Sequence, residues 1–433
     1  MNLILIFLLY QVLQLILSPL LIAILIKRKI KKKITIGSFK ERFGFVPKTK
    51  KNKKIIWIHA VSVGEILSVQ NVIENIKQKV ENSDCFLTTG TISGKKIAQQ
   101  NITSDYLSFL PFDFLIPMLI AFKRIKPAAI IIIEAETWPN FLMLAKFFSI
   151  PIYSLNARIS TRSKKRYLNL KIFLRPLFNI FKIIFVQSQE DKKNFEKLKI
   201  NPFKIKTLGN IKTFNVLSKK EKLEKFKIFK IEKLYKTLLV GSLHSGELEI
   251  YLNLFKNIKK EFSNIKLILA PRHFHWQNEL IKKVKSTGYK YYLWQKDEHK
   301  NLSEFINKKF EIYDILLVCK LGELFKLYQM SDLFFLGGTF VPVGGHNLLE
   351  PSVWSNPSII GLYNHNCKDI ANKLEKQNAI IKIKNQDKLL LQTKHLLKNP
   401  DLAKSIGQNA QKWLLSEAKI VQKNLKILWN ELI

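Results

Sequence analysis

Short apolar runs repeat along the chain from residue 55 onward, and each is followed by a polar turn and then by an amphipathic segment. The runs are continuous stretches of Ile, Val and Leu, which is typical of parallel strands buried on both faces of a sheet. Helical spacing over 65–77 and 192–198 follows two of these runs, so the pattern predicts βαβ units. The strands predicted in the first half are 55–58, 85–88, 107–110, 128–133, 152–155, 183–186 and 205–208.

The same rhythm begins again after a Lys-rich stretch at 217–236, which we interpret as a linker with a helical piece. The strands predicted in the second half are 238–240, 265–269, 315–318, 333–336 and 358–360. The pattern therefore predicts an α/β protein with two Rossmann-like, doubly wound domains in tandem. Because ligands of such sheets bind beyond the carboxyl ends of the strands, we expect the site in a cleft that the two domains face.

The N-terminal stretch 3–26 carries no charged residue. As a helix it would be about 36 Å long, enough to cross a hydrocarbon core of about 30 Å, although Gln11 and Gln14 would need partners in lipid. A basic run at 27–33 follows it, and the positive-inside rule then places the remaining chain in the cytoplasm. A cleaved signal peptide is disfavoured because no Lys or Arg precedes the apolar stretch, whereas a helix lying in the membrane interface stays open. We predict an N-terminal membrane anchor.

Charge is the unusual feature of the composition, with 72 Lys+Arg against 33 Asp+Glu and a formal net charge of +39. Such a field favours anionic partners, here an anionic inner membrane, although Lys is abundant throughout the sequence and part of the charge is solvated surface. The three cysteines, Cys85, Cys319 and Cys367, are far apart, so we expect neither a disulfide framework nor a metal site.

Polar loops follow the predicted strands at the ends where ligands bind. Glu65, in HAVSVGE, opens a helix, and it is either a favourable charge in a first helical turn or a general base. Glu134 and Glu136, in EAETWPN, come directly after four isoleucines, and they are either catalytic or paired with Arg158 or Arg272.

A glycine-rich turn stands in the second half, within GGTFVPVGGHNLLEP. Gly344 and Gly345 lead into His346, Asn347 and a predicted helix, where exposed N–H groups would suit a phosphate. Glu350, one turn into that helix, is placed to accept the hydroxyls of a ribose. We interpret this stretch as a nucleotide half-site.

These motifs together resemble the 3-deoxy-D-manno-octulosonic acid (Kdo) transferases of lipopolysaccharide assembly. The resemblance rests on HAVSVGE, EAETWPN, NARIS, APRH, LGEL, NCKDI and the long glycine motif, in that order along the chain. It implies the GT-B fold and an inverting, metal-independent transfer of Kdo from CMP-Kdo to the acylated glucosamine disaccharide of the lipid A precursor, with no cofactor. The sequence departs from the family pattern after Lys212, where Thr213 and Phe214 stand.

The resemblance also implies roles for individual residues. Glu65 is the expected general base, and one of Glu134 and Glu136 is a second essential carboxylate near the acceptor. The residues expected on the donor side are Lys212, Ser242, Arg272, His273, Gly344, Gly345, His346, Asn347 and Glu350.

The expected organisation is an anchor at 1–26, a basic juxtamembrane segment at 27–52, an acceptor-binding domain at 53–215, a linker at 216–236 and a CMP-Kdo-binding domain at 237–433. The catalytic domains are expected on the cytoplasmic face of the inner membrane of a Gram-negative bacterium. Three alternatives compete: another GT-B enzyme using a different nucleotide sugar, a basic nucleic-acid-binding protein, and an inactive membrane scaffold. Dispersed charge without a known module argues against nucleic acid as a partner.

Overall fold

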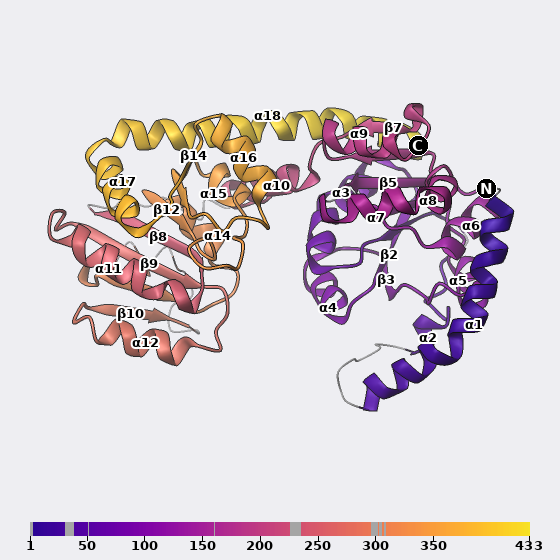
Figure 1. Ribbon diagram of the computed structural model, residues 1–433, viewed down its shortest axis with the longest axis horizontal. Coiled ribbons are helices and arrows are strands. Elements are labelled where there is room, and N and C mark those ends of the chain that lie inside the picture. The colour runs from indigo at the N-terminus through magenta and orange to yellow at the C-terminus, as the bar shows by residue number, and fades with distance from the viewer. Residues whose placement is uncertain are drawn as a thin grey trace. The chain divides into compact units, whose positions relative to one another are not determined.

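The structure is a computed structural model. It describes residues 3–30, 39–50, 52–159, 161–225, 235–295, 302, 305–306 and 309–433, and their side chains except at 20–30, 161–162 and 222–225. The chain divides into two compact units, the first comprising Met1–Asn215 with Ala418–Ile433 and the second comprising Val216–Glu417 (Figure 1). Parts of the predicted basic segment 27–52 and of the predicted linker 216–236 lie outside the described residues.

The first unit is built on a parallel sheet with the strand order β3-β2-β1-β4-β5-β6-β7. Its strands are β1 (Lys54–His59), β2 (Ser83–Thr89), β3 (Tyr106–Phe109), β4 (Ala129–Ile133), β5 (Ile152–Ala157), β6 (Ile183–Val186) and β7 (Ile205–Thr207). Every residue of β4 is buried, because helices cover both faces of the sheet. All seven strands predicted in this half are confirmed.

The helices of the first unit follow the strands, as βαβ connections require. They are α3 (Val63–Lys79), α4 (Ile92–Asn101), α5 (Leu115–Ile125), α6 (Pro139–Phe147), α7 (Thr161–Asn169), α8 (Lys171–Phe178) and α9 (Gln189–Lys197). The short helix α2 (Phe39–Arg42) precedes β1. Ser62, Thr91 and Ser188 cap α3, α4 and α9 with side-chain oxygens, which satisfies backbone N–H groups at the start of each helix.

The second unit repeats the design with the strand order β10-β11-β9-β8-β12-β13-β14, again parallel. Its strands are β8 (Lys236–Leu243), β9 (Ile265–Pro271), β10 (Tyr291–Trp294), β11 (Ile315–Val318), β12 (Leu333–Leu336), β13 (Ser358–Ile360) and β14 (Ile380–Lys382). Strands β10 and β14 were not predicted from the sequence. Both lie at sheet edges and are partly exposed, so they lack the continuous apolar signal of a central strand.

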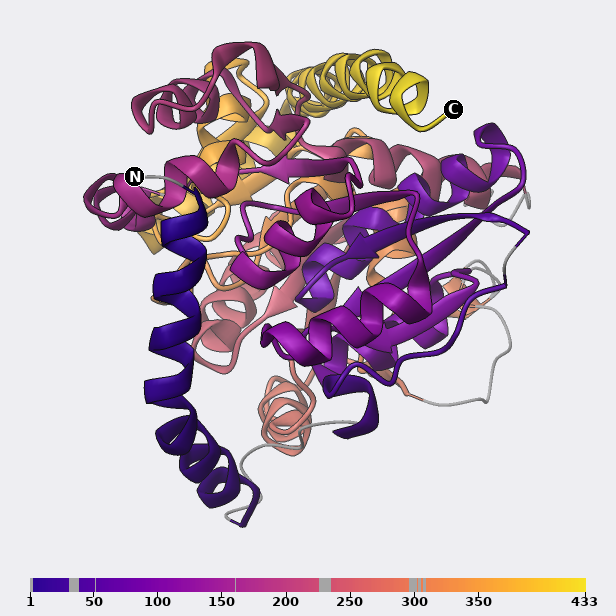
Figure 2. The same cartoon turned by 90° about the vertical axis from the view of Figure 1, so that its right-hand side faces the viewer.

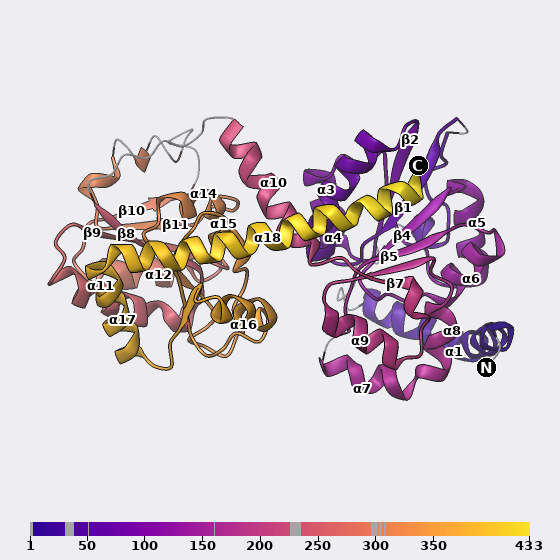
Figure 3. The ribbon, with the colours of Figure 1, turned by 90° about the horizontal axis from the view of Figure 1, so that it is seen from above.

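The helices that follow complete the second unit. They are α10 (Ile211–Lys225), α11 (Leu248–Lys259), α12 (Gln277–Lys285), α14 (Leu324–Leu327), α15 (Leu349–Val353), α16 (Lys368–Lys376), α17 (Gln386–Lys398) and α18 (Pro400–Leu432). The residues of α10 up to Asn215 belong to the first unit. Helix α18 is the long helix that follows α17 and reaches the C-terminus (Figure 3). Its residues from Ala418 onward belong to the first unit, although the sequence analysis had assigned them to the second domain. Val421, Leu425 and Trp429 explain the difference, because they are buried in the core of the first sheet.

The N-terminal segment is the helix α1 (Leu3–Ile30), indigo in Figure 2. It lies against α6 and α8. In the part of the chain that the structure describes, no helix has both the length and the apolar character needed to cross a membrane. The predicted spanning anchor at 1–26 is therefore not supported.

Polar groups on α1 turn toward the domain instead of toward lipid. The Tyr10 hydroxyl donates to Asp113 Oδ2 at 3.0 Å, and Gln14 Nε2 donates to the Asp113 carbonyl at 2.7 Å. Gln11 Nε2 bonds Asn140 Oδ1 at 2.5 Å. The two amides that weakened the prediction of a spanning helix thus find their partners in the protein. Burial is the largest cause that raises the pKa of Asp113 to about 7.

Candidate functional site

In each sheet the chain first adds strands on one side of the starting strand and later adds strands on its other side. We call the place between these two sets of strands the strand-reversal point. In the first unit β2 and β3 lie on one side of β1 and β4 lies on the other, and in the second unit β9 and β12 flank β8 in the same way. Loops that leave the carboxyl ends of such neighbouring strands diverge and open a crevice, which is where open α/β sheets bind ligands. The predicted catalytic carboxylates of the first unit, and Arg272, His273 and His346 of the second, follow the strands at these two points.

Three carboxylates gather at the reversal point of the first unit. Glu65 follows β1, and Glu134 and Glu136 follow β4. Burial first, and then the charge of Glu65, raise the pKa of Glu134, an effect that Lys212 and Arg158 oppose. Burial, Glu65 and Glu134 raise the pKa of Glu136 to about 7. The structure therefore brings the three predicted catalytic residues together, with one carboxyl group poised to exchange a proton near neutral pH.

Glu65 is held firmly by the turn that begins α3. Its Oε2 accepts from the Val61 N–H at 2.8 Å, and its Oε1 accepts from the Ser62 hydroxyl at 2.7 Å and from the Ser62 N–H at 3.3 Å. This is a capping box, in which the Ser62 hydroxyl also accepts from the Glu65 N–H. Glu65 thus lies in the first turn of α3, as the structural interpretation of the sequence predicts, and the capping bonds also orient its carboxylate.

The loop that carries Glu134 is constrained by its neighbours. Glu134 has a left-handed backbone with φ of 61°, which is costly for a residue with a side chain and is concentrated at functional sites. The Ser154 hydroxyl donates to the Glu134 carbonyl at 2.7 Å, and the Tyr167 hydroxyl donates to the Ala135 carbonyl at 3.3 Å. Of the two arginines considered as partners, Arg158 is the one whose positive charge lowers the pKa of Glu134. Lys212, predicted on the donor side, lies in the first unit, and its positive charge also lowers the pKa of Glu134.

The reversal point of the second unit carries a cluster of histidines with Arg272. His244 follows β8, Arg272 and His273 follow β9, and His346 comes from the loop after β12. The imidazoles of His244 and His346 are nearly parallel and meet through their Nε2 atoms, which are 2.9 Å apart. Arg272, His273 and His346 were predicted together, whereas His244 was not selected. His244 lies in the polar stretch 241–247 that ends β8, and only the fold shows that His244 faces His346.

A buried glutamate shapes the loop that carries His346. Glu247 is fully buried, and its two carboxylate oxygens accept from the N–H groups of Gly338, Thr339 and Phe340 at 2.7 to 3.0 Å. The His244 N–H reaches the same carboxylate at 3.3 Å. Because these donors come from the loops after β8 and β12, Glu247 holds the two loops in register. Burial raises the pKa of Glu247, and these four N–H groups oppose the shift.

The glycine turn differs from the prediction. Gly344 and Gly345 have positive φ angles of 105° and 71°, as only glycine tolerates readily. Their N–H groups donate to the Gly338 carbonyl at 2.9 and 2.8 Å, so they close the loop and do not stand exposed for a phosphate. Ser242 also has a left-handed φ of 57°, at the irregularity where β8 pairs with β9.

The two remaining donor-side residues have partners within the second unit. Asn347 Oδ1 accepts from the Leu349 N–H at 2.9 Å, which initiates α15. Glu350, predicted to bind a ribose, forms an ion pair with Lys219 at 3.2 Å. Among the described residues, no group of His, Cys, Asp and Glu has a geometry that would hold a metal ion.

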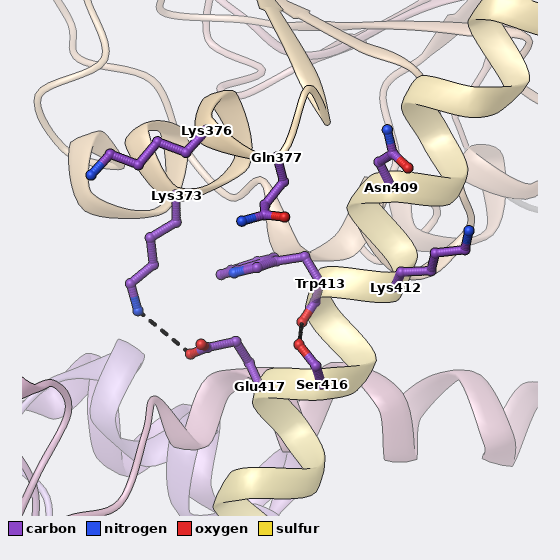
Figure 4. A pocket seen from close by; sticks show the side chains of 8 residues that line it. All are labelled: Lys373, Lys376, Gln377, Asn409, Lys412, Trp413, Ser416 and Glu417. Atoms are coloured by element: carbon purple, nitrogen blue, oxygen red, sulfur yellow. Dashed lines mark hydrogen bonds and ion pairs between the residues drawn. The ribbon is translucent and has the colours of Figure 1, made fainter.

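A surface pocket of about 530 Å³ lies elsewhere in the second unit, between α16 and α18. Figure 4 shows its lining, in which Lys373 points toward Glu417 and reaches it at 3.5 Å. Its other lining residues are Lys376, Gln377, Asn409, Lys412, Trp413 and Ser416. None of the predicted site residues lines this pocket, so we do not assign the candidate chemistry to it.

Comparison with known proteins identifies the family. The family model described as 3-deoxy-D-manno-octulosonic-acid transferase (kdotransferase) matches residues 37–215. The 3-deoxy-D-manno-octulosonic acid transferase of Aquifex aeolicus is 30% identical over 355 residues, covering 82% of this chain and 89% of that protein. The protein of the same description from Rickettsia prowazekii is 32% identical over 382 residues, covering 86% of this chain and 79% of that protein.

A solved structure supports the fold independently of the sequence. A glycosyltransferase from Rickettsia africae superposes with a TM-score of 0.52 at 15% identity, covering 88% of this chain and 99% of that chain. The two parallel α/β units thus resemble glycosyltransferases of the GT-B class, as predicted. With the motif order, the fold and these relatives in agreement, the chain belongs to the 3-deoxy-D-manno-octulosonic acid transferase family and is a glycosyltransferase.

Proposed function

We propose that this enzyme transfers Kdo from CMP-Kdo to a hydroxyl of the acylated glucosamine disaccharide of a lipid A precursor, with inversion and without a metal ion. The observation that carries the proposal is the arrangement of charge at the two strand-reversal points. Three carboxylates occupy the one in the first unit, while Arg272 and histidines occupy the one in the second unit. Transfer from a nucleotide sugar needs both a base for the acceptor and positive charge for the leaving phosphate.

On the acceptor side we assign Glu65 as the general base. The acceptor oxygen forms a bond to the anomeric carbon of Kdo, its proton passes to a carboxylate, and the bond from that carbon to the CMP phosphate breaks. The bonds from Val61 and Ser62 hold the Glu65 carboxylate in one orientation before the acceptor arrives. Glu134 and Glu136 complete the carboxylate cluster, and the raised pKa of Glu136 suits it to receive a proton at neutral pH.

On the donor side we assign Arg272, His273 and His346 to the anionic groups of CMP-Kdo. Arg272 and His273 are exposed at the end of β9, so a ligand can reach them. The guanidinium of Arg272 is able to hold two phosphate oxygens at once as negative charge develops on the departing CMP. Ser242, Gly344, Gly345 and Asn347 shape the surrounding loops, while Lys212 balances the acceptor-side carboxylates.

We also propose that the first unit works at a membrane surface, with α1 lying on the bilayer. The buried or partly buried positions of α1, among them Ile6, Tyr10 and Gln14, recur at helical spacing and face the domain. The other side exposes Leu and Ile side chains, including Leu15 at 76% and Ile16 at 68% exposed area. Exposed apolar surface of this kind inserts favourably at the headgroup boundary, where a lipid acceptor also lies.

Mass spectrometry tests the reaction directly. The full-length protein is incubated with lipid A precursor and an in situ supply of CMP-Kdo, and the expected product is heavier by whole Kdo residues. Thermal stabilisation by CMP but not by UDP is the second expected result, because a ligand that binds only the folded state raises its stability. Stabilisation by UDP instead would indicate a GT-B enzyme that uses another nucleotide sugar.

A further inference from the structure

His244 and His346 form a pair that straddles the strand-reversal point of the second unit. Their rings are nearly parallel, at an interplanar angle of 5° and a centroid separation of 5.2 Å, and their Nε2 atoms are 2.9 Å apart. At that separation one Nε2 carries a proton and donates it, while the other accepts, so the pair is uncharged in this arrangement. Both residues are partly buried, so part of each remains accessible to solvent.

The groups around this pair are positive or neutral. Arg272 and His273 face it from the loop after β9, with the His273 ring 5.9 Å from the His244 ring. His275 lies beyond His273, and the His365 ring lies against Gly344. The carboxylate of Glu247 comes from the next turn, but four backbone N–H groups already share it. The pair thus lacks a free anionic neighbour among these groups.

Protonation of the pair is therefore unfavourable while the crevice holds no anion. Burial first, and then Arg272, His244 and His273, lower the pKa of His346 to about 4. Burial, His273 and Arg272 lower the pKa of His244 as well. An anion at Arg272 would reverse the electrostatic part of this effect, because it cancels the guanidinium charge and attracts a second positive charge.

We propose that His244 and His346 take up a proton between them when the phosphate of the donor binds beside Arg272, so that the pair converts into a cationic phosphate clamp. This inference rests on the proposed function, and it adds His244 to the donor-binding residues. Proton uptake would add a second positive charge to that of Arg272 only while the negative charge of the bound CMP is present. Affinity for CMP would then rise as pH falls, by up to about tenfold per pH unit.

Calorimetric titration of the full-length protein with CMP tests the proposal. Titrations at pH 6.5, 7.0 and 7.5 are repeated in buffers with different ionisation enthalpies, because the dependence of the binding enthalpy on the buffer gives the number of protons exchanged. CMP contributes its own exchange, since the second pKa of a phosphate monoester is about 6. That contribution is the same for wild type and variants, so the difference between them isolates the histidines.

We expect wild type to take up about half a proton more at pH 6.5 than His346→Asn or His244→Asn. His395→Asn, an exposed histidine on α17, serves as the matched control and should behave as wild type. Cytidine, which lacks the phosphate, should bind without uptake in every protein. Circular dichroism checks that both variants remain folded, and each removes one half of the pair independently.

Equal proton exchange in wild type and both variants would overturn the proposal. If wild type binds CMP but exchanges as many protons as the variants, the proposed role of the histidines is wrong and the assignment of CMP-Kdo as the donor stands. If wild type does not bind CMP at all but binds UDP, the proposed donor itself is wrong. Uptake that persists with cytidine would place the titrating groups away from the phosphate and would also refute the clamp.

Discussion

Oε2 of Glu65 accepts a hydrogen bond of 2.8 Å from the backbone N–H of Val61, four residues earlier in the chain. The other oxygen of this carboxylate accepts from the Ser62 N–H in the capping box of α3, so one side chain both caps the helix and is the proposed catalytic base. The two purposes predict different consequences of mutation. Loss of a cap costs stability, whereas loss of a base costs turnover.

We predict that Glu65→Gln lowers Kdo transfer by about 10²- to 10⁴-fold, because an amide cannot accept the acceptor's proton. The variant should lose only about 1 kcal/mol of stability and should keep its affinity for CMP. Turnover, calorimetry with CMP and thermal unfolding measure the three effects. Ser188→Ala removes the cap of α9 and is the matched control, since it should cost similar stability with normal turnover. Near-normal transfer by Glu65→Gln would exclude its role as the base.

We predict that Glu136 makes the first unit less stable as the pH rises from 5 to 8. Burial and the carboxylates of Glu65 and Glu134 raise the pKa of Glu136 to about 7, whereas an unfolded glutamate titrates near pH 4.3. Between these values the folded state holds a proton that the unfolded state has released, so stability falls as the pH rises through this window.

Glu136→Gln cannot ionise, so its thermal midpoint should fall less than that of wild type between pH 5 and pH 8. Glu81→Gln, at an exposed glutamate of the same unit, is the control and should follow wild type. Parallel pH profiles for wild type and Glu136→Gln would show that Glu136 titrates as an ordinary exposed carboxyl group.

We predict that Arg272→Ala weakens CMP binding and turnover together, and that Arg272→Lys restores only part of the loss. A guanidinium bonds two phosphate oxygens in a fixed geometry, whereas an ammonium acts as a point charge. Calorimetry with CMP measures the affinity, and Lys285→Ala removes an exposed cation from the same unit as a control. Unchanged affinity in Arg272→Ala would remove Arg272 from the donor site.

We predict that the double variant Leu15→Ser/Ile16→Ser binds lipid vesicles at least about tenfold more weakly than wild type, because it loses apolar area from the exposed side of α1. The thermal midpoint should not change, since neither side chain packs on the domain. Flotation with anionic vesicles at low and high salt measures the binding. Ile92→Ser, which removes an exposed apolar residue from α4, is the control. Equal flotation of both variants and wild type would mean that α1 does not contact lipid.

The amino-acid sequence alone was enough to predict the layered α/β architecture. Continuous runs such as Ile130–Ile133 are buried on both faces only in a parallel sheet, so the pattern predicted strands, their direction and two units. It also indicated where the chemistry lies, because the carboxyl ends of parallel strands meet at one edge of the sheet. The family resemblance then supplied a role for Glu65, for one of Glu134 and Glu136, and for Arg272. Each of these inferences depends on a local pattern or a short motif.

The tertiary structure decided every feature that needs a partner distant in sequence. Gln11 and Gln14 read as part of an apolar segment until Asp113 and Asn140 provide their hydrogen bonds, and so the helix rests on the protein. The end of α18 joins the first unit because its apolar side complements that core. Likewise His244 becomes significant only beside His346, 102 positions later in the chain. Hydrogen bonding and charge act between neighbours in space, and those neighbours exist only after the sheets have assembled.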